Sequence, residues 1–312
     1  MAAINNFGGF YRTEVYIHEA RMAGGVIHNP CVNHSQALTD VEGKDVWLGF
    51  IHLKGLASEI RHAVPTNRSQ RGPFQSLEDF IHRISIAMEQ LQLLINVGAF
   101  RFTGKSKGEL TLQARLLLKN LDQDKLRGTP TLFEEPARTF EVPVLDHGEF
   151  EDVFDELELL QFPVSKSPYE LLQDQNHGAT RVADFLQREG QRVEMVAYLL
   201  SRKPVPAVNG NMSFGTWIDI AGEYFDTVHF PDVLERFPFN APGCYRIWGK
   251  VVVEYDFPMI EVSRCEHQPI IADPRYEESD TRLPVGRRDN VPFVLGRKAY
   301  PGAKERKVRF GN

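Results

Sequence analysis

The chain has 312 residues, of which 42% are hydrophobic and 25% charged, with 24 Gly and 19 Pro. This composition is typical of globular proteins, so it excludes a wholly disordered or fibrous chain, and the length suffices for about two domains. The formal net charge of −6 excludes a uniformly basic nucleic-acid coat, although a local basic surface is compatible with it.

No segment has the pattern of an export signal or a membrane span. Residues 1–6 carry neither a basic lead nor an apolar stretch, and the apolar runs at 91–95 and 251–253 are too short to cross a bilayer. The three cysteines lie far apart, which favours a reducing compartment over a disulfide framework. We therefore expect a cytoplasmic protein without a membrane partner.

The first third of the chain is predicted to be mainly helical. Apolar residues at 3.6-residue spacing predict a helix over 11–22, and 46–50 is predicted to be a strand. Residues 52–120 are predicted to be helices separated by glycine turns. Ser76 is the expected N-cap of one helix, and Ser106 with Glu109 forms a capping box at the start of another.

The middle of the chain changes character. Three prolines break any helix between 121 and 150, which predicts a linker. An acidic helix is expected over 149–160, with its carboxylates on a solvated face. They belong to Asp152, Asp155, Glu156 and Glu158.

Strands follow, and then a basic tail. Segments rich in β-branched and aromatic residues predict five strands, with a short helix over 232–237 after the third, which is the element order of the OB fold. The predicted strands cover residues 193–200, 214–220, 224–230, 244–255 and 259–262. Residues 282–312 hold nine Lys or Arg against two Asp or Glu, and we expect a basic, mobile tail there.

Several stretches of the chain carry recognisable motifs: 4–14 with 18–21, 30–35, Leu48-Gly49-Phe50-Ile51-His52-Leu53-Lys54-Gly55-Leu56, 72–80, Leu94-Ile95-Asn96-Val97-Gly98-Ala99-Phe100, 214–219 and 228–232. In this order, they resemble the bacterial DNA polymerase III alpha subunit. The resemblance covers residues 4–275. It implies an α+β multidomain chain, in which a helical helix-hairpin-helix region precedes a five-stranded OB-fold β-barrel. The implied divisions are 1–50 (end of the fingers region), 51–120 (tandem helix-hairpin-helix), 121–150 (linker), 151–190 (helical connector), 191–272 (OB fold) and 273–312 (basic tail).

The resemblance does not extend to the catalytic part of that family. The PHP domain, and the palm aspartates that hold two metal ions, have no counterpart in this sequence. We therefore expect no catalytic residue, metal ligand or cofactor in this chain, with Mg²⁺ held by the palm of the intact polymerase. His28, Cys31 and His34 have metal-like spacing, but no fourth ligand lies close in sequence.

The function that remains for this chain is the binding of DNA. Helix-hairpin-helix turns hold duplex DNA through backbone N–H groups at a glycine turn, and the alternative for each turn here is an ordinary helix-turn-helix contact or a solvated helix start. The expected duplex contacts are Lys54, Gly55 and Ser58 in one turn and Arg101, Lys105 and Lys107 in another, with Phe100 in the core. On the OB fold, bases stack on aromatic side chains and phosphates meet basic ones. The candidates are Arg202, Lys203, Phe214, Trp217, Tyr224 and Lys250, although the sequence leaves open which of them face the core.

Leu132 and Phe133 stand where the family often carries a peptide that binds the sliding clamp, but Thr129 replaces its usual Gln. The alternative is that this pair packs on its own domain. The sequence thus predicts the C-terminal DNA-binding portion of a DNA polymerase III alpha subunit, which grips primer-template duplex and single-stranded template beside a palm-bearing remainder. The alternative functions are a free-standing, non-enzymatic DNA-binding protein and the OB domain of an RNA-binding enzyme.

Overall fold

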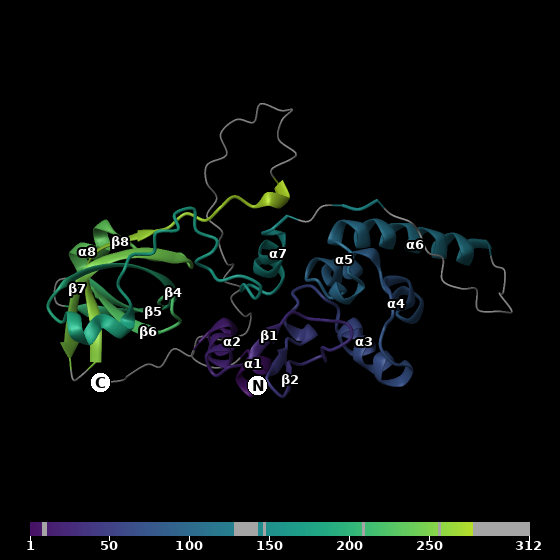
Figure 1. Cartoon of the computed structure of the whole chain (residues 1–312), viewed down its shortest axis with the longest axis horizontal. Coiled ribbons are helices and arrows are strands. Elements are labelled where there is room, and N and C mark those ends of the chain that lie inside the picture. Colours follow the sequence, from purple (N-terminus) through teal and green to yellow (C-terminus); the bar gives the residue numbers. More distant parts are fainter. Residues whose placement is uncertain (8–10, 128–142, 146–147, 208–209, 255–256, 277–312) are drawn as a thin grey trace, which may run out of the picture. The chain divides into compact units, whose positions relative to one another are not determined.

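A computed structural model describes residues 1–7, 11–127, 143–145, 148–207, 210–254 and 257–276, with only the backbone described over 120–127 and at 207. It has a helical part followed by a β-barrel (Figure 1). The structure confirms the predicted α+β class.

Helices dominate the described residues up to 159. The α-helices are α1 (Ala2–Asn6), α2 (Thr13–Met22), α3 (Ser58–Arg71), α4 (Leu77–Arg83), α5 (Met88–Asn96), α6 (Lys107–Arg127) and α7 (Glu151–Leu159). The 3-10 turns are η1 (Phe50–His52) and η2 (Arg101–Thr103). Helix α6 continues into the segment that the sequence predicts to be a linker, since the first of its three prolines is Pro130.

A small sheet lies between α2 and α3 in sequence. Its strands are β1 (Val26–His28), β2 (Asp40–Glu42) and β3 (Asp45–Trp47), in the order β1-β3-β2. Strand β3 pairs in parallel with β1 and antiparallel with β2. The predicted strand over 46–50 is therefore shorter than expected and gives way to η1.

The predicted helix caps are present. The Ser76 hydroxyl oxygen accepts a hydrogen bond from the Asp79 N–H at 3.2 Å. At the start of α6, the Ser106 N–H donates to a Glu109 carboxylate oxygen at 2.6 Å, and the Glu109 N–H donates to Ser106 Oγ at 3.2 Å. Both ends of this capping box are made, so α6 begins at a defined residue.

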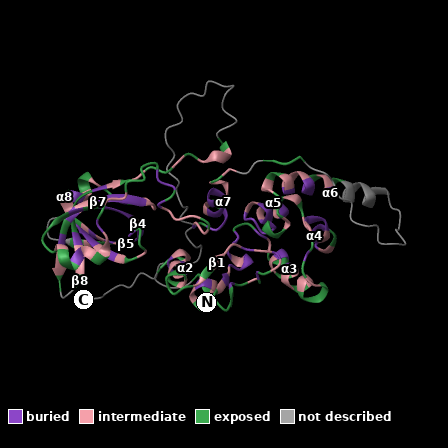
Figure 2. Ribbon diagram, in the orientation of Figure 1, coloured by how far each residue is buried: buried purple, intermediate pink, exposed green. Residues whose placement is uncertain are grey.

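The helical core is continuous and apolar (Figure 2). Phe80 packs edge-on against Phe74 and Phe100, with ring centroids 4.9 and 5.0 Å apart, and all three rings are buried. Leu159 and Leu160, at the end of α7, join the same cluster. Helix α7 therefore belongs to the helical part.

The barrel closes in the order β4-β5-β6-β8-β7. Its elements, with the 3-10 turns on either side, are η3 (Val182–Arg188), β4 (Arg192–Ala207), β5 (Gly210–Ile218), β6 (Tyr224–His229), α8 (Pro231–Arg236), β7 (Cys244–Glu254), β8 (Phe257–His267) and η4 (Pro274–Tyr276). Strand β4 pairs with both β5 and β7, and β6 pairs in parallel with β8. With α8 after the third barrel strand, this is the predicted OB arrangement.

Alternation sets the barrel interior. Along β4, Val193, Met195, Ala197 and Leu199 point into one core cluster, which also holds Trp217. The residues between them take the outer face, as the period of two requires.

Candidate nucleic-acid interface

The first turn, residues 53–58, lies between η1 and α3. Gly55 has a φ of +84°, a conformation that residues with a side chain rarely adopt. Lys54, Gly55 and Ser58 are exposed, whereas Leu56 is buried and anchors the turn to the core. The three residues expected to contact duplex DNA at this turn therefore all lie on its accessible side.

Two side chains hold the first turn in shape. Gln90, from α5, accepts a hydrogen bond from the Ala57 N–H at 2.6 Å and donates to the Gly55 carbonyl at 3.1 Å. Arg61, from α3, donates to the Leu56 carbonyl at 2.9 and 2.6 Å. The sequence analysis missed both residues, because neither lies in the turn and no spacing links Gln90 to it.

The N-terminus of α3 is open. Ala57 occupies the N-cap and has no side-chain group to accept a hydrogen bond. Within the described part of the chain, nothing accepts a hydrogen bond from the backbone N–H of Ser58 or Glu59. Such free donors at the positive end of a helix favour an anion, and a phosphate oxygen has the matching chemistry.

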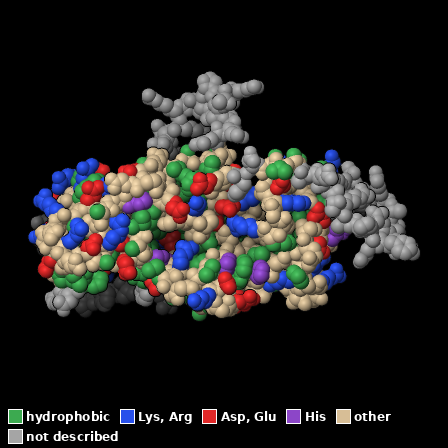
Figure 3. Space-filling model, viewed as in Figure 1, with side chains coloured by type: hydrophobic (Ala, Val, Ile, Leu, Met, Phe, Trp, Pro, Cys, Tyr) green, Lys and Arg blue, Asp and Glu red, His purple; other side chains and the backbone are tan. Residues whose placement is uncertain are grey.

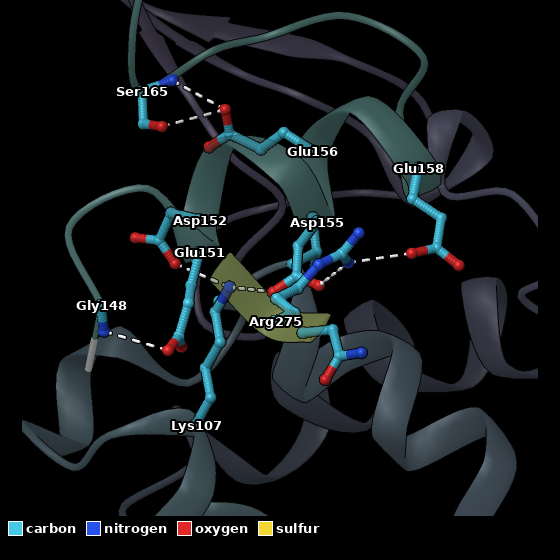
Figure 4. A network of polar contacts seen from close by, with 12 residues as sticks. Lys107, Gly148, Glu151, Asp152, Asp155, Glu156, Glu158, Ser165 and Arg275 are labelled. Carbon is cyan, nitrogen blue, oxygen red and sulfur yellow. Dashed lines mark hydrogen bonds and ion pairs between the residues drawn. The ribbon is translucent and has the colours of Figure 1, made fainter. Parts of the chain in front are cut away.

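The second turn, residues 98–107, is different. Arg101 forms an ion pair with Asp152 at 3.0 Å, and Lys107 forms one with the same carboxylate at 2.7 Å and another with Asp155. Lys105 is exposed, and its ammonium donates to the Gln113 side-chain oxygen at 2.9 Å. Two of the three cations predicted to contact DNA here therefore already hold carboxylates of α7, and Figure 4 shows Lys107 between Asp152 and Asp155.

Helix α7 corrects one sequence expectation. The predicted solvated face is wrong for Asp155, which is 4% exposed, and for Glu156, which is fully buried. Glu156 accepts hydrogen bonds from the backbone N–H groups of Val164 and Ser165 at 2.7 and 2.9 Å (Figure 4). Buried carboxylates persist where such donors and cations compensate their lost hydration.

The electrostatics of Asp152 follow from its partners. Burial acts to raise the pKa of this carboxyl, but hydrogen bonds and charge from Lys107 and Arg101 outweigh it and lower the pKa to about 2. Asp152 is therefore fully ionised at neutral pH and holds both cations.

The segment after the barrel also meets α7. Arg275, in η4, pairs with Asp155 at 2.7 Å, Glu158 at 2.9 Å and Asp273 at 2.7 Å (Figure 4). The hydrogen bond to Asp273 makes the largest contribution to raising the guanidinium pKa. Residues 273–276, which the sequence assigns to a mobile tail, are thus part of the folded structure, because Arg275 pairs with the buried carboxylate of Asp155.

The metal-like motif has another role. The imidazoles of His28 and His34 stack on the indole of Trp47, each with ring centroids 4.1 Å apart. His28 also pairs with Asp45 at 2.6 Å. Among the described residues, no group of three or more His, Cys, Asp or Glu could hold a metal ion.

The barrel brings together only some of the predicted single-strand contacts. Lys203 and Phe214 are direct partners across β4 and β5, and both are at least partly exposed. Lys250 is exposed on β7 and pairs with Glu261 of β8. Glu261 in turn pairs with Val228 of β6, and Val228 pairs with Phe214 of β5. These side chains share the outer face of the barrel.

Trp217, Arg202 and Tyr224 do not join this face. The prediction that Trp217 contacts a base is wrong, because its ring is fully buried and its indole N–H donates to Thr227 Oγ1 at 2.7 Å. Arg202 lies over the Phe239 ring, with its guanidinium carbon 5.1 Å from the centroid. Tyr224 is half-buried and packs against the cluster that holds Val15, and burial raises its pKa.

An aromatic residue that the sequence analysis missed does lie on the outer face. Trp248, two residues before Lys250 on β7, is half-buried, and the Arg264 guanidinium lies 4.5 Å from the centroid of its ring. The inward placement of Tyr245 and Ile247 shows the phase of β7 that points Trp248 outward. Leu132 and Phe133, the predicted clamp contacts, lie outside the described residues.

The surface shows no single charged field on the face in view. Figure 3 shows basic and acidic side chains interspersed there. In the part of the chain that the structure describes, no helix is both long and apolar enough to cross a membrane.

Comparison with known proteins matches these features. Residues 24–110, which include both turns, match the family model of a helix-hairpin-helix motif. The error-prone DNA polymerase of Mycobacterium tuberculosis is 34% identical over 103 residues, which cover 32% of this chain and 9% of the relative. The DNA polymerase III subunit alpha of Staphylococcus epidermidis is 27% identical over 261 residues, covering 79% of this chain and 23% of the relative. That of Treponema pallidum is 25% identical over 248 residues, covering 74% and 21%.

The chain thus spans less than a quarter of the length of these relatives. The matches to the alpha subunits extend over about three quarters of it, beyond the helix-hairpin-helix region. The chain is therefore related to the C-terminal part of bacterial DNA polymerase III alpha subunits.

Proposed function

We propose that this chain is a DNA-binding portion of a DNA polymerase III alpha subunit and that it grips the duplex backbone at the first turn. The observation that carries the proposal is the open N-terminus of α3, where Ser58 and Glu59 keep free N–H donors beside the exposed Lys54. Such contacts bind phosphate without reading base sequence, as a replication protein requires.

A proline substitution tests the backbone contact directly. Ser58 is the first residue of α3, a position where proline is well tolerated, and Ala57 has φ −64° and ψ 144°, which suit a residue before proline. Ser58→Pro removes one N–H donor and keeps the helix, whereas Ser58→Ala removes the hydroxyl and keeps the donor.

Fluorescence anisotropy with a labelled duplex separates the two variants. A hydrogen bond to a charged group contributes about 1.5–3 kcal/mol, so we expect Ser58→Pro to weaken binding by about 10- to 150-fold. Ser58→Ala should bind like the wild type. Equal affinity of all three proteins, or no duplex binding by the wild type, contradicts the proposal.

We propose that single-stranded template lies on the outer face of the barrel. Phe214 and Trp248 offer ring faces, and Lys203 and Lys250 offer charge for the phosphates. Phosphate neutralisation makes both modes sensitive to salt.

The enzyme itself needs more than this chain. We propose that a palm-bearing part of the polymerase, with Mg²⁺ on its aspartates, carries out nucleotide addition in the cytoplasm, and that a sliding clamp binds through Leu132 and Phe133. Primer extension by a palm-bearing polypeptide, with and without this chain, distinguishes that role from a free-standing DNA-binding protein. Stimulation supports the former, and its absence supports the latter.

A further inference from the structure

Among the described residues, helix α7 forms ion pairs with the cations of the second turn and none with Lys54 of the first turn. The two carboxylate oxygens of Asp152 take one cation each: Oδ1 lies 2.7 Å from Lys107 Nζ, and Oδ2 lies 3.0 Å from Arg101 Nη2. A DNA phosphate also offers neighbouring anionic oxygens. The Asp152 carboxylate therefore occupies the place at which a backbone phosphate would pair with Arg101 and Lys107.

One cation of the second turn is also largely covered. The Lys107 side chain is only 14% exposed. A Cβ added to Gly108, in the first turn of α6, would lie 3.0 Å from Leu145, which precedes α7 in the chain. An incoming phosphate therefore meets side chains from the segment that leads into α7, as well as a carboxylate.

The first turn has no such cover. Among residues placed in the structure, none forms an ion pair with Lys54, and Gly55 and Ser58 are exposed. Helix α7 meets this turn at the Leu159 carbonyl, which accepts a hydrogen bond from the Lys54 N–H at 2.9 Å. That contact leaves the Lys54 ammonium and the N-terminus of α3 accessible.

We propose that α7 is a built-in phosphate mimic, which occupies the second turn through Asp152 so that duplex DNA engages the first turn alone until α7 is displaced. This inference rests on the proposed duplex binding and concerns its regulation. While α7 is in place, Arg101 and Lys107 do not contribute to DNA affinity. Displacement of α7 exposes both cations and adds phosphate contacts.

Charge removal at Asp152 tests the mimic. Asp152→Asn keeps the shape of the side chain but releases Arg101, whereas Lys107 keeps its ion pair with Asp155. The matched control is Glu158→Gln, which removes the same charge from the same helix at a carboxylate that pairs with Arg275 instead. Duplex affinity is measured by anisotropy between 0.05 and 0.2 M salt, after circular dichroism has established that each variant is folded.

The expected result is specific to Asp152. Each additional phosphate contact steepens the plot of log K against log[salt] by about 0.9, so Asp152→Asn, which frees Arg101, should steepen it by about 1 and tighten binding about tenfold at 0.1 M salt. Glu158→Gln should leave slope and affinity close to those of the wild type. Equal changes in both variants, or none in Asp152→Asn, overturn the mimic.

A second variant serves if Asp152→Asn does not fold. Arg101→Gln in the wild-type background should leave duplex affinity unchanged, because Asp152 already occupies that cation. A several-fold loss with a shallower salt slope overturns the inference. The proposed function fails separately, if the wild type does not bind duplex or if Ser58→Pro binds as tightly as Ser58→Ala.

Discussion

Acid should selectively remove the stabilisation that Asp152 contributes. Its pKa is about 2 in the folded chain, against an ordinary value of 3.8, because Lys107 and Arg101 outweigh the opposing effect of burial. A difference of this size corresponds to about 2 kcal/mol of stability, at roughly 1.4 kcal/mol for each pH unit. The side chain is 26% exposed, so solvent screens only part of this interaction.

The direction follows from proton linkage. A folded-state pKa below the unfolded one means that the unfolded chain takes up the proton first as the pH falls. The contribution is therefore complete above about pH 4 and is lost as the pH falls through about 2. Above this window it does not change with pH.

Urea unfolding of the wild type and Asp152→Asn, at several pH values from 7 downward, measures the effect. The free energy of unfolding should differ by about 2 kcal/mol at pH 7, and the gap should begin to close below pH 4. Glu158→Gln is the control, because its exposed ion pair is worth about 1 kcal/mol or less. A gap that stays constant down to the lowest pH at which both proteins fold refutes the reasoning.

Three further outcomes are expected. Gln90→Ala loses both hydrogen bonds to the first turn. The free energy of unfolding, measured by thermal denaturation, should therefore fall by about 1–2 kcal/mol, and duplex binding, measured by anisotropy, should weaken. Trp217→Phe should destabilise the barrel by about 1–3 kcal/mol without changing single-strand affinity, whereas Phe214→Ala should weaken single-strand binding by about 1–3 kcal/mol and spare stability. Replacing Leu132 and Phe133 by Ala should abolish clamp capture in surface plasmon resonance, and surviving capture counts against the clamp peptide.

The barrel shows what sequence periodicity can and cannot predict. Segments rich in β-branched and aromatic residues predicted all five strands, but β8 runs to His267, five residues beyond its predicted end. Its second half carries Arg264 and Glu266 on the outer face, next to an irregularity opposite Trp248 and Gly249, and polar residues there mask the strand signal. Alternation also gives a period without a phase, which is why the sequence left open which face Trp217 takes, and the structure places it in the core.

The helical site shows a different limit. Glycine turns and caps are local signals, so the sequence located both turns and the start of α6. The partners of the second turn are not local, because Lys107 and Asp152 are 45 positions apart in sequence. Packing of α7 against the helical part brings them together, and no spacing in the chain records that packing. The sequence therefore predicted that Arg101 and Lys107 contact DNA, whereas the structure pairs them with Asp152.

The closure of the barrel has a consequence for how ligands are recognised. Strand β4 is long enough to pair with β7 at its start and with β5 at its end, and β6 pairs with β8, so each barrel strand has a neighbour on both sides. Backbone groups are paired on both sides along much of this sheet, whereas stretches such as 201–207 of β4 and 264–267 of β8 pair on one side only. Where a strand is paired on both sides, a partner of the barrel is recognised by the side chains on its surface or by its loops, and the pairing also protects these strands from edge-to-edge aggregation.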